Sequence, residues 1–429
     1  MTMSKQHLKL KKRKIIEWFS ICAALLPLLY LYKTPVPGIS NFMGLGEFLL
    51  AILFTIVMII ENLRIKIKKD WFTILCLYSA FGSIFAIVYP WFNEKEYLAG
   101  VCRVIFYWLL FENAESLLNS DIFIKVYKKA AVVFSIYLII QFIFYYALGI
   151  KLPSYISQNI MFEIPGDNEE YLRYFFRGRS VFNEPSYFTL YAAPYIAITG
   201  IKAEKITLRE WIGLMIVTIS LLLSTGVSGI LLACISWLGI YLYQLRHKNK
   251  KMNPMFLIVA VVGAIGLFVF FTSSATAMTV NRLLTGSSAS ARIYRGVIVA
   301  QNMQFPEIIS GVGLNQDSAF QEYYNIQTIY DESPYHTLQS SFVGIYVQLG
   351  LVGLIIFVLW GISLINSSKT YSSKIIALLL LVISIYEKNM FLYRMGFYLF
   401  IWLALNDASN SDHKYIKLLT ENKHLGEKI

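Results

Sequence analysis

The side chains best suited to chemistry lie in two stretches, and each stretch contains paired arginines. The first, RGRSVFNEPSYF, covers residues 177–188 and contains Arg177, Arg179 and Glu184. The second, SARIYRGVIVAQ, contains Arg292 and Arg295, which would share one face of a helix because they are three residues apart. A planar guanidinium group binds phosphate or carboxylate through two parallel hydrogen bonds. The two stretches therefore predict anion binding, with the carboxylate of Glu184 close by.

Glu184 and His336 are the candidate acid–base residues, and each has a structural alternative. Glu184 precedes Pro185, so it either caps the positive end of a helix dipole or faces a cavity together with an arginine. His336 stands shortly before another apolar run. A lone histidine is commonly a surface or hydrogen-bonding residue, whereas a histidine at a helix start in an arginine-bearing loop is a candidate acid or base.

The composition indicates which elements must position these side chains. Of 429 residues, 57% are hydrophobic and 15% are charged, whereas soluble domains have about 25% charged residues. We therefore predict an all-α polytopic membrane protein with about 12 transmembrane helices of roughly 20 apolar residues each. The predicted spans are residues 15–32, 43–60, 71–89, 97–113, 129–149, 183–201, 211–224, 227–244, 254–273, 339–365, 374–387 and 390–406.

The distribution of basic residues predicts the orientation of these helices. The loops 61–70, 201–210 and 245–253 are rich in lysine and arginine, which collect in cytoplasmic loops. The same rule accounts for the net charge of +12, so nucleic-acid binding is not expected. Both chain ends are then cytoplasmic, and the basic N-terminal segment leads into an uncleaved first helix rather than a removed signal peptide.

Residues 1–406 are predicted to form a single integral membrane domain, followed by a cytoplasmic tail at 407–429. Two long loops lie outside the cytoplasm, at 150–182 and 274–338, and long loops commonly carry function. The arginines of the outer segments all lie in these loops: Arg173, Arg177, Arg179, Arg282, Arg292 and Arg295. The cysteines fall inside apolar segments without paired spacing, so we interpret them as buried structural thiols. The loops show no cluster of metal ligands, so neither a metal nor a cofactor is expected.

Three segments together resemble the surface-polysaccharide polymerases of bacteria, the Wzy-type O-antigen polymerases, and the related O-antigen ligases. RGRSVFNEPSYF is similar to the family's arginine followed by F-x-E-P at a helix start. SARIYRGVIVAQNMQFPEIISGVGLNQ resembles its arginine, amphipathic helix, proline and G-x-G. HTLQSSFVGIYVQLGLVG resembles a histidine-led helix that ends in G-L-x-G. His336 precedes Gly350 by 14 residues, more than the family pattern leads us to expect, so Gln339 is an alternative occupant of the histidine position.

The resemblance implies a GT-C-like architecture and a metal-independent glycosyltransferase at the outer face of the cytoplasmic membrane. The expected substrate is a polyprenyl-diphosphate-linked oligosaccharide. The growing chain would leave its lipid diphosphate and join the terminal sugar of another lipid-linked unit, which builds O-antigen, capsule or exopolysaccharide. The residues expected to bind the diphosphate are Arg177, Arg179, Arg292 and Arg295. Arg292 is also expected to assist catalysis, with Glu184 or His336 as the base. Membrane lipid and a chain-length regulator protein are further expected partners.

Three alternatives remain open. An O-antigen ligase uses the same donor but transfers the glycan to lipid A core or to protein, and the E-P-S motif favours the polymerase. A flippase or transporter of lipid-linked sugars would show internal repeats, which the sequence lacks, and polar groups within its spans, where Arg103 and Arg394 are the main charges. A structural membrane protein would leave the outer arginines unexplained.

Overall fold

The computed structural model is built from helices. It describes residues 2–36, 43–61, 66–154, 176, 178–201, 206–224, 227–246, 289–326, 340–388 and 390–407. No β-strand occurs in these ranges. The predicted all-α fold class is therefore confirmed for the described part of the chain.

The described part of the chain is a succession of helices. In order they are α1 (Thr2–Ala24), α2 (Leu26–Leu29), α3 (Leu45–Glu61), α4 (Trp71–Phe81), the 3₁₀ helix η2 (Gly82–Val88), α5 (Glu94–Leu117), α6 (Ser120–Leu148), α8 (Pro185–Ala192), α9 (Pro194–Gly200), α10 (Leu208–Leu223), α11 (Val227–Arg246), α14 (Ala289–Gln301), α15 (Glu307–Ser310), α16 (Asp317–Tyr323), α17 (Ser341–Asn366) and α18 (Tyr371–Tyr386). A final helix covers residues 393–407.

Several helices have the length and composition of membrane spans. Within the described ranges, four are long and apolar enough to cross a membrane: Trp71–Val88, Ser120–Leu148, Ser228–Arg246 and Ser341–Asn366. Two shorter apolar helices are Leu45–Ile60 and Tyr371–Tyr386. Each of the six coincides with a predicted span, which supports a polytopic membrane protein. The predicted span 254–273 lies outside the described residues, and the total of about 12 spans stays a prediction.

Several predicted spans are interrupted rather than continuous, and two of them show how this happens. Residues 183–201 divide into α8 and α9 at Pro194, which has no backbone N–H to continue the helical ladder. Residues 71–89 form α4 and then the tighter 3₁₀ helix η2. Local backbone chemistry therefore divides apolar stretches that hydropathy alone treats as single elements.

The interpretation of the cysteines as buried is correct for only part of the set. Cys22 and Cys76 are buried, whereas Cys102 and Cys234 are exposed. Cys102 and Cys234 lie on outward faces of α5 and α11, both predicted spans, and a thiol there behaves as a small apolar group. An apolar stretch specifies a helix that avoids water, but it does not specify which of its faces packs against protein.

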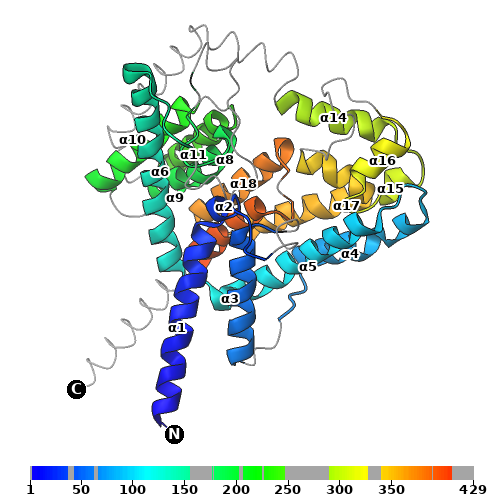
Figure 1. Cartoon of the computed structure of the whole chain (residues 1–429), viewed down its shortest axis with the longest axis horizontal. Coiled ribbons are helices and arrows are strands. Elements are labelled where there is room, and N and C mark those ends of the chain that lie inside the picture. Colours follow the sequence, from blue (N-terminus) through cyan, green and yellow to red (C-terminus); the bar gives the residue numbers. More distant parts are fainter. Residues whose placement is uncertain are drawn as a thin grey trace.

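The helix α18 lies between the two sides of the molecule (Figure 1). Helices α6 and α8–α11 lie on one side of α18, and α4, α5 and α14–α17 lie on the other. α18 packs against α9 and α11 on the first side and against α14 and α17 on the second. It therefore connects the elements that follow the first arginine stretch with the helix that carries the second.

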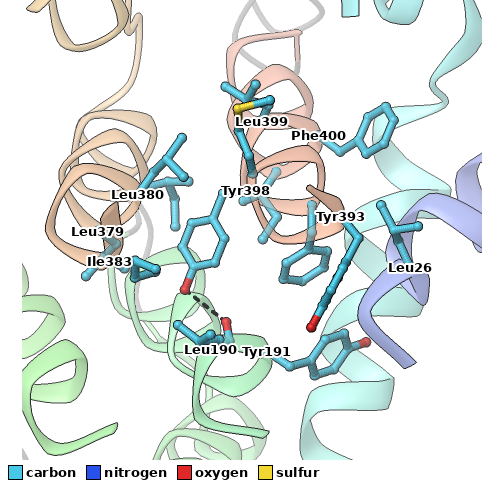
Figure 2. Close-up of a cluster of buried hydrophobic side chains, with 14 of the residues drawn as sticks. Leu26, Leu190, Tyr191, Leu379, Leu380, Ile383, Tyr393, Tyr398, Leu399 and Phe400 are labelled. Carbon is cyan, nitrogen blue, oxygen red and sulfur yellow. Dashed lines mark hydrogen bonds between the residues drawn. The ribbon is translucent and has the colours of Figure 1, made fainter. Parts of the chain in front are cut away.

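The final helix, 393–407, packs between α18 and α8 through buried aromatic rings. Figure 2 shows Tyr398 beside Leu380 of α18, with its Oη donating to Leu190 O of α8 at 2.9 Å. Tyr191 and Phe397 stack with their ring centroids 5.2 Å apart. These contacts hold the first turns of the final helix against the last turn of α8, the helix that begins within the first motif.

Candidate functional site

A buried serine fastens the RGRS part of the first motif to the side of α6. Ser180 N donates to Gln141 Oε1 at 2.9 Å, and Gln141 Nε2 donates back to Ser180 O at 3.0 Å. Both Ser180 and Gln141 are buried. The neighbouring Arg179 is only partly buried, and its Nη1 donates to Asn183 O at 3.0 Å. Arg179 is thereby positioned next to the start of α8, while Arg177 lies outside the described residues.

Glu184 occupies the capping position of α8 without acting as a side-chain cap. Its backbone is extended, Pro185 begins the helix, and its carboxylate accepts no hydrogen bond from the described backbone N–H groups of the first turn. Instead Glu184 Oε2 accepts a hydrogen bond from Ser186 Oγ at 3.0 Å, and the side chain is exposed. Glu184 is therefore not a side-chain cap, and its carboxylate is open to solvent at the start of α8.

A buried ion pair lies beside the first turn of α8. Arg394 is 9% exposed and Glu387 is 2% exposed. Arg394 Nη1 lies 3.0 Å from Glu387 Oε2, and Arg394 Nε donates to Tyr393 Oη at 3.0 Å. The guanidinium carbon lies 4.3 Å from the centre of the Tyr187 ring, which permits a cation–π attraction. Because an unpartnered buried charge is costly, these contacts hold the ion pair and α8 in one arrangement.

The start of α17 is attached to the same ion pair. Glu387 O accepts hydrogen bonds from Ser341 N at 3.1 Å and from Ser341 Oγ at 2.9 Å. Ser340 Oγ donates to a carbonyl in the last turn of α18 at 2.6 Å, and both serines are buried. The third motif therefore enters α17 beside Glu387. His336 and the alternative Gln339 precede Ser340 and lie outside the described residues.

The sequence pattern indicates Arg394 as a charge within a span, and it provides no sign of Tyr187 as its partner. An arginine inside a predicted span is a functional hypothesis by default. The signal available was therefore Arg394 together with an acidic residue seven positions earlier, at the preceding helix end. Tyr187 had no such signal, because it is separated from Arg394 by most of the C-terminal half of the chain.

Arg292 and Arg295 lie on one helix, as their spacing predicts. α14 covers Ala289–Gln301 and contains both residues, which therefore share a face. The side chain of Arg295 is partly buried, whereas that of Arg292 lies outside the described part of the structure. α14 packs against α17 and α18. The second arginine stretch is thus carried by a neighbour of the two helices whose ends meet at Glu387.

The second and third motifs meet where two glycines cross. Gly350 interrupts α17 with φ 66° and ψ −169°, and a Cβ atom at this position would lie 2.1 Å from Ile309 O. The segment after Gly311 runs along the interruption, and Val312 N donates to Val347 O at 2.8 Å. Only residues without a side chain permit this approach of two backbones. The G-x-G of the second motif and the G-L-x-G of the third are parts of one structural joint, called here the glycine joint (residues 311–313 and 350).

The described elements together define a class of protein. It is an all-helical membrane protein in which the starts of α8, α17 and the final helix meet around a buried ion pair, with arginines on nearby elements. The described residues contain no group of three or more His, Cys, Asp or Glu side chains that would hold a metal ion. The chemistry offered by the described side chains is anion binding by guanidinium groups and proton transfer by a carboxylate.

Comparison with known proteins supports one superfamily. Residues 212–358 match the model of a family described as O-antigen ligase. This match confirms the predicted resemblance to the superfamily of O-antigen polymerases and ligases. The matched segment contains Arg292, Arg295 and the glycine joint, and it excludes Glu184 and Arg394. No curated protein matches the chain. The family supports glycosyl transfer in surface-polysaccharide synthesis and does not separate a polymerase from a ligase.

Proposed function

We propose that the protein is a polymerase that joins polyprenyl-diphosphate-linked oligosaccharide repeat units at the outer face of the cytoplasmic membrane. The observation that carries the proposal is the meeting of the starts of α8 and α17 at the ion pair of Glu387 and Arg394. It brings the segment with Arg179 and Glu184 close to Ser340 and Ser341, where α17 begins. In the proposed topology, the loops 150–182 and 274–338 face outward and both chain ends are cytoplasmic.

The reaction is a glycosyl transfer with a diphosphate leaving group. A hydroxyl oxygen of the acceptor sugar forms the new bond to the anomeric carbon of the donor. The bond from that carbon to the diphosphate oxygen breaks, and its electron pair leaves with the diphosphate. The hydroxyl proton passes to a base. Because negative charge grows on the diphosphate oxygens, positive groups already held in place lower the barrier most.

Each proposed site residue has a role in this reaction. The residues that bind the diphosphate are Arg177, Arg179, Arg292 and Arg295. Arg292 also stabilises the departing charge, because a guanidinium fork matches the geometry of phosphate oxygens. Glu184 accepts the proton of the acceptor hydroxyl, which suits its exposed carboxylate. His336 is the alternative base.

A ligase is the second candidate, because the family match, whose description is O-antigen ligase, does not separate the two functions. A ligase would use the same arginines and the same donor, but its acceptor would be lipid A core or protein. Deletion of the gene separates the two functions. Loss of a polymerase leaves surface glycans of one repeat unit, whereas loss of a ligase leaves long polymer attached to the lipid carrier.

Substitution of the site residues tests the proposal. Arg177→Ala and Arg292→Ala are expected to lower polymer formation about a hundredfold or more, because each removes a charge that stabilises the transition state. Glu184→Gln keeps the shape of the side chain and removes the base. Polymer length is read from gel ladders, with the amount of protein measured in the same cells.

Arg209→Ala is the matched control for these variants. Arg209 is an exposed arginine at the start of α10, on the predicted cytoplasmic side, and its loss should leave the ladder unchanged. Normal ladders from Arg177→Ala, Arg292→Ala and Glu184→Gln, at normal protein abundance, would remove the site assignment.

A further inference from the structure

A shallow pocket of about 570 Å³ lies between the connection 90–95 and α16. Trp91 and Glu94 line it from the connection, and Glu322 and Tyr323 line it from α16. The connection separates two predicted spans on their outer side, and α16 belongs to the second outer loop. The proposed topology therefore places both walls outside the cytoplasm. None of these residues belongs to the site proposed around the ion pair.

Hydrogen bonds hold the two walls of this pocket together. The buried side chain of Gln316 accepts a hydrogen bond from Asn93 N at 2.6 Å and donates one to Asn93 O at 3.0 Å. Trp91 Nε1 donates to Val312 O at 3.3 Å. Gln316 immediately precedes α16, and Val312 belongs to the glycine joint. The pocket is therefore preorganised by the same segment that crosses the interruption in α17.

In the pocket region, two solvent-exposed tyrosine rings pack against the buried ring of Trp91. The ring centroid of Trp91 lies 5.6 Å from that of Tyr323 and 5.5 Å from that of Tyr324. Trp91 is 7% exposed, whereas Tyr323 is 54% and Tyr324 is 41% exposed. A tyrosine ring offers a flat apolar face with a polar edge. A ring already supported by its neighbours loses little conformational freedom when it binds a ligand.

The pocket is also lined by charged side chains, some of which accept hydrogen bonds and one of which donates them. Glu94, Lys95 and Glu322 are exposed and line the same pocket. Carboxylates accept hydrogen bonds, an ammonium group donates them, and a sugar hydroxyl does both. Two negative groups against one positive group disfavour an anionic ligand such as a diphosphate. The chemistry of the pocket fits a neutral polyol with one apolar face, which describes a sugar ring.

We propose that this pocket is a glycan-binding subsite for the lipid-linked oligosaccharide. The C–H face of a sugar ring packs on Tyr323, and its hydroxyls bind Glu94, Lys95 and Glu322. The inference rests on the proposed function and adds to it the place where the sugar chain is recognised. Because α16 and α8 lie on opposite sides of α18 (Figure 1), the subsite holds sugars away from Glu184 at the start of α8.

Binding of a lipid-free oligosaccharide tests the subsite. The probe is the repeat unit of the source organism, released from its lipid diphosphate by mild acid, and the full-length protein is held in lipid nanodiscs. Tyr323→Ala and Glu322→Gln should each weaken binding by about tenfold, because stacking or a hydrogen bond is lost. Tyr323→Phe keeps the ring and should bind within about twofold of wild type. Tyr241→Ala removes an exposed ring of α11, 46% exposed, and should not change binding.

The outcomes separate this inference from the proposed function. Arg292→Ala should abolish polymer and still bind the oligosaccharide, whereas Tyr323→Ala should lose oligosaccharide binding and form shorter polymer. A wild-type protein that does not bind the probe, or a Tyr323→Ala protein that binds it normally with an unchanged melting temperature, overturns the subsite. Failure of the proposed function would instead leave probe binding intact and show normal ladders from the arginine variants.

Discussion

Arg394 carries a positive charge in a place almost closed to solvent, and each of its contacts lowers the cost of that charge. Glu387 supplies the opposite charge, Tyr393 accepts a hydrogen bond, and the Tyr187 ring lies against the guanidinium face. Glu387 and Tyr393 are close to Arg394 in the chain, whereas Tyr187 comes from a distant segment. The side chain therefore acts as a positioning residue, which sets α8 against the final helix and the start of α17.

Arg394→Lys tests that role because it keeps the charge and removes the planar fork. A lysine ammonium group cannot reproduce the contacts to Glu387, Tyr393 and Tyr187 together. We expect a loss of about 2 kcal/mol in the free energy of unfolding, and shorter polymer. Thermal unfolding in detergent micelles measures the first effect, and gel ladders measure the second.

The exposed Arg209→Lys is the control for this exchange and should leave both readings unchanged. Equal melting temperatures for Arg394→Lys and Arg209→Lys would show that the fork of Arg394 has no positioning role.

The interior of α17 is interrupted at Gly350, and another segment of the chain binds to the interrupted turn. Its broken turn accepts a hydrogen bond from the segment that follows Gly311, which then continues into the pocket with α16. One irregular turn therefore joins α17 to the second outer loop. A continuous helix has no free carbonyl group in its interior to offer such a segment.

Gly350→Ala should destabilise the protein more than Gly149→Ala. Both glycines have positive φ, but Gly149 is left-handed α with φ 68° and ψ 14°, where alanine costs about 1–2 kcal/mol in backbone strain. Gly350 has φ 66° and ψ −169°, a conformation almost confined to glycine, so the strain there is at least as large. At Gly149 nothing lies within 4 Å of the added Cβ, whereas at Gly350 the Cβ would lie 2.1 Å from Ile309 O. The difference between the two melting temperatures measures what the close approach and the unusual ψ of Gly350 add together. Equal losses would contradict the glycine joint.

Across the chain as a whole, the structure brings together the helix ends that the charge pattern predicts to face outward. The starts of α8, α17 and the final helix and the end of α18 all meet near Glu387. If the predicted number of spans between these helix ends were wrong by one, some of the ends would lie on opposite sides of the membrane. The geometry is therefore consistent with the predicted order of crossings, while the absolute orientation stays a prediction.

Thiol labelling tests the absolute orientation. Single cysteines are placed at the exposed Tyr323 and at the exposed Ser367, which follows the opposite end of α17, in a chain whose native cysteines are replaced by alanine. A membrane-impermeant maleimide should label Tyr323→Cys in intact spheroplasts and label Ser367→Cys only after the membrane is opened. The reverse pattern would place the predicted outer loops in the cytoplasm and end the proposed mechanism.

Short-range physics explains what the amino-acid order alone was able to specify. Apolar runs predicted the membrane helices, the spacing of Arg292 and Arg295 predicted a common face wherever they lie on a helix, and Pro185 predicted a helix start directly after Glu184. Each of these features depends on residues within a few positions of one another, so it leaves a local pattern. The resemblance to the superfamily, later supported by the match at 212–358, rests on the same kind of local pattern.

The contacts between distant segments were decided only by the folded arrangement. The stacking of Arg394 on Tyr187, the crossing of Gly311 with Gly350, and the pocket between Trp91 and α16 each join segments without a shared periodicity. Such pairs depend on which helix faces turn toward one another, and packing sets those faces through many weak contacts. Hydropathy specifies that a helix avoids water, whereas its neighbours determine which side chains it presents to them.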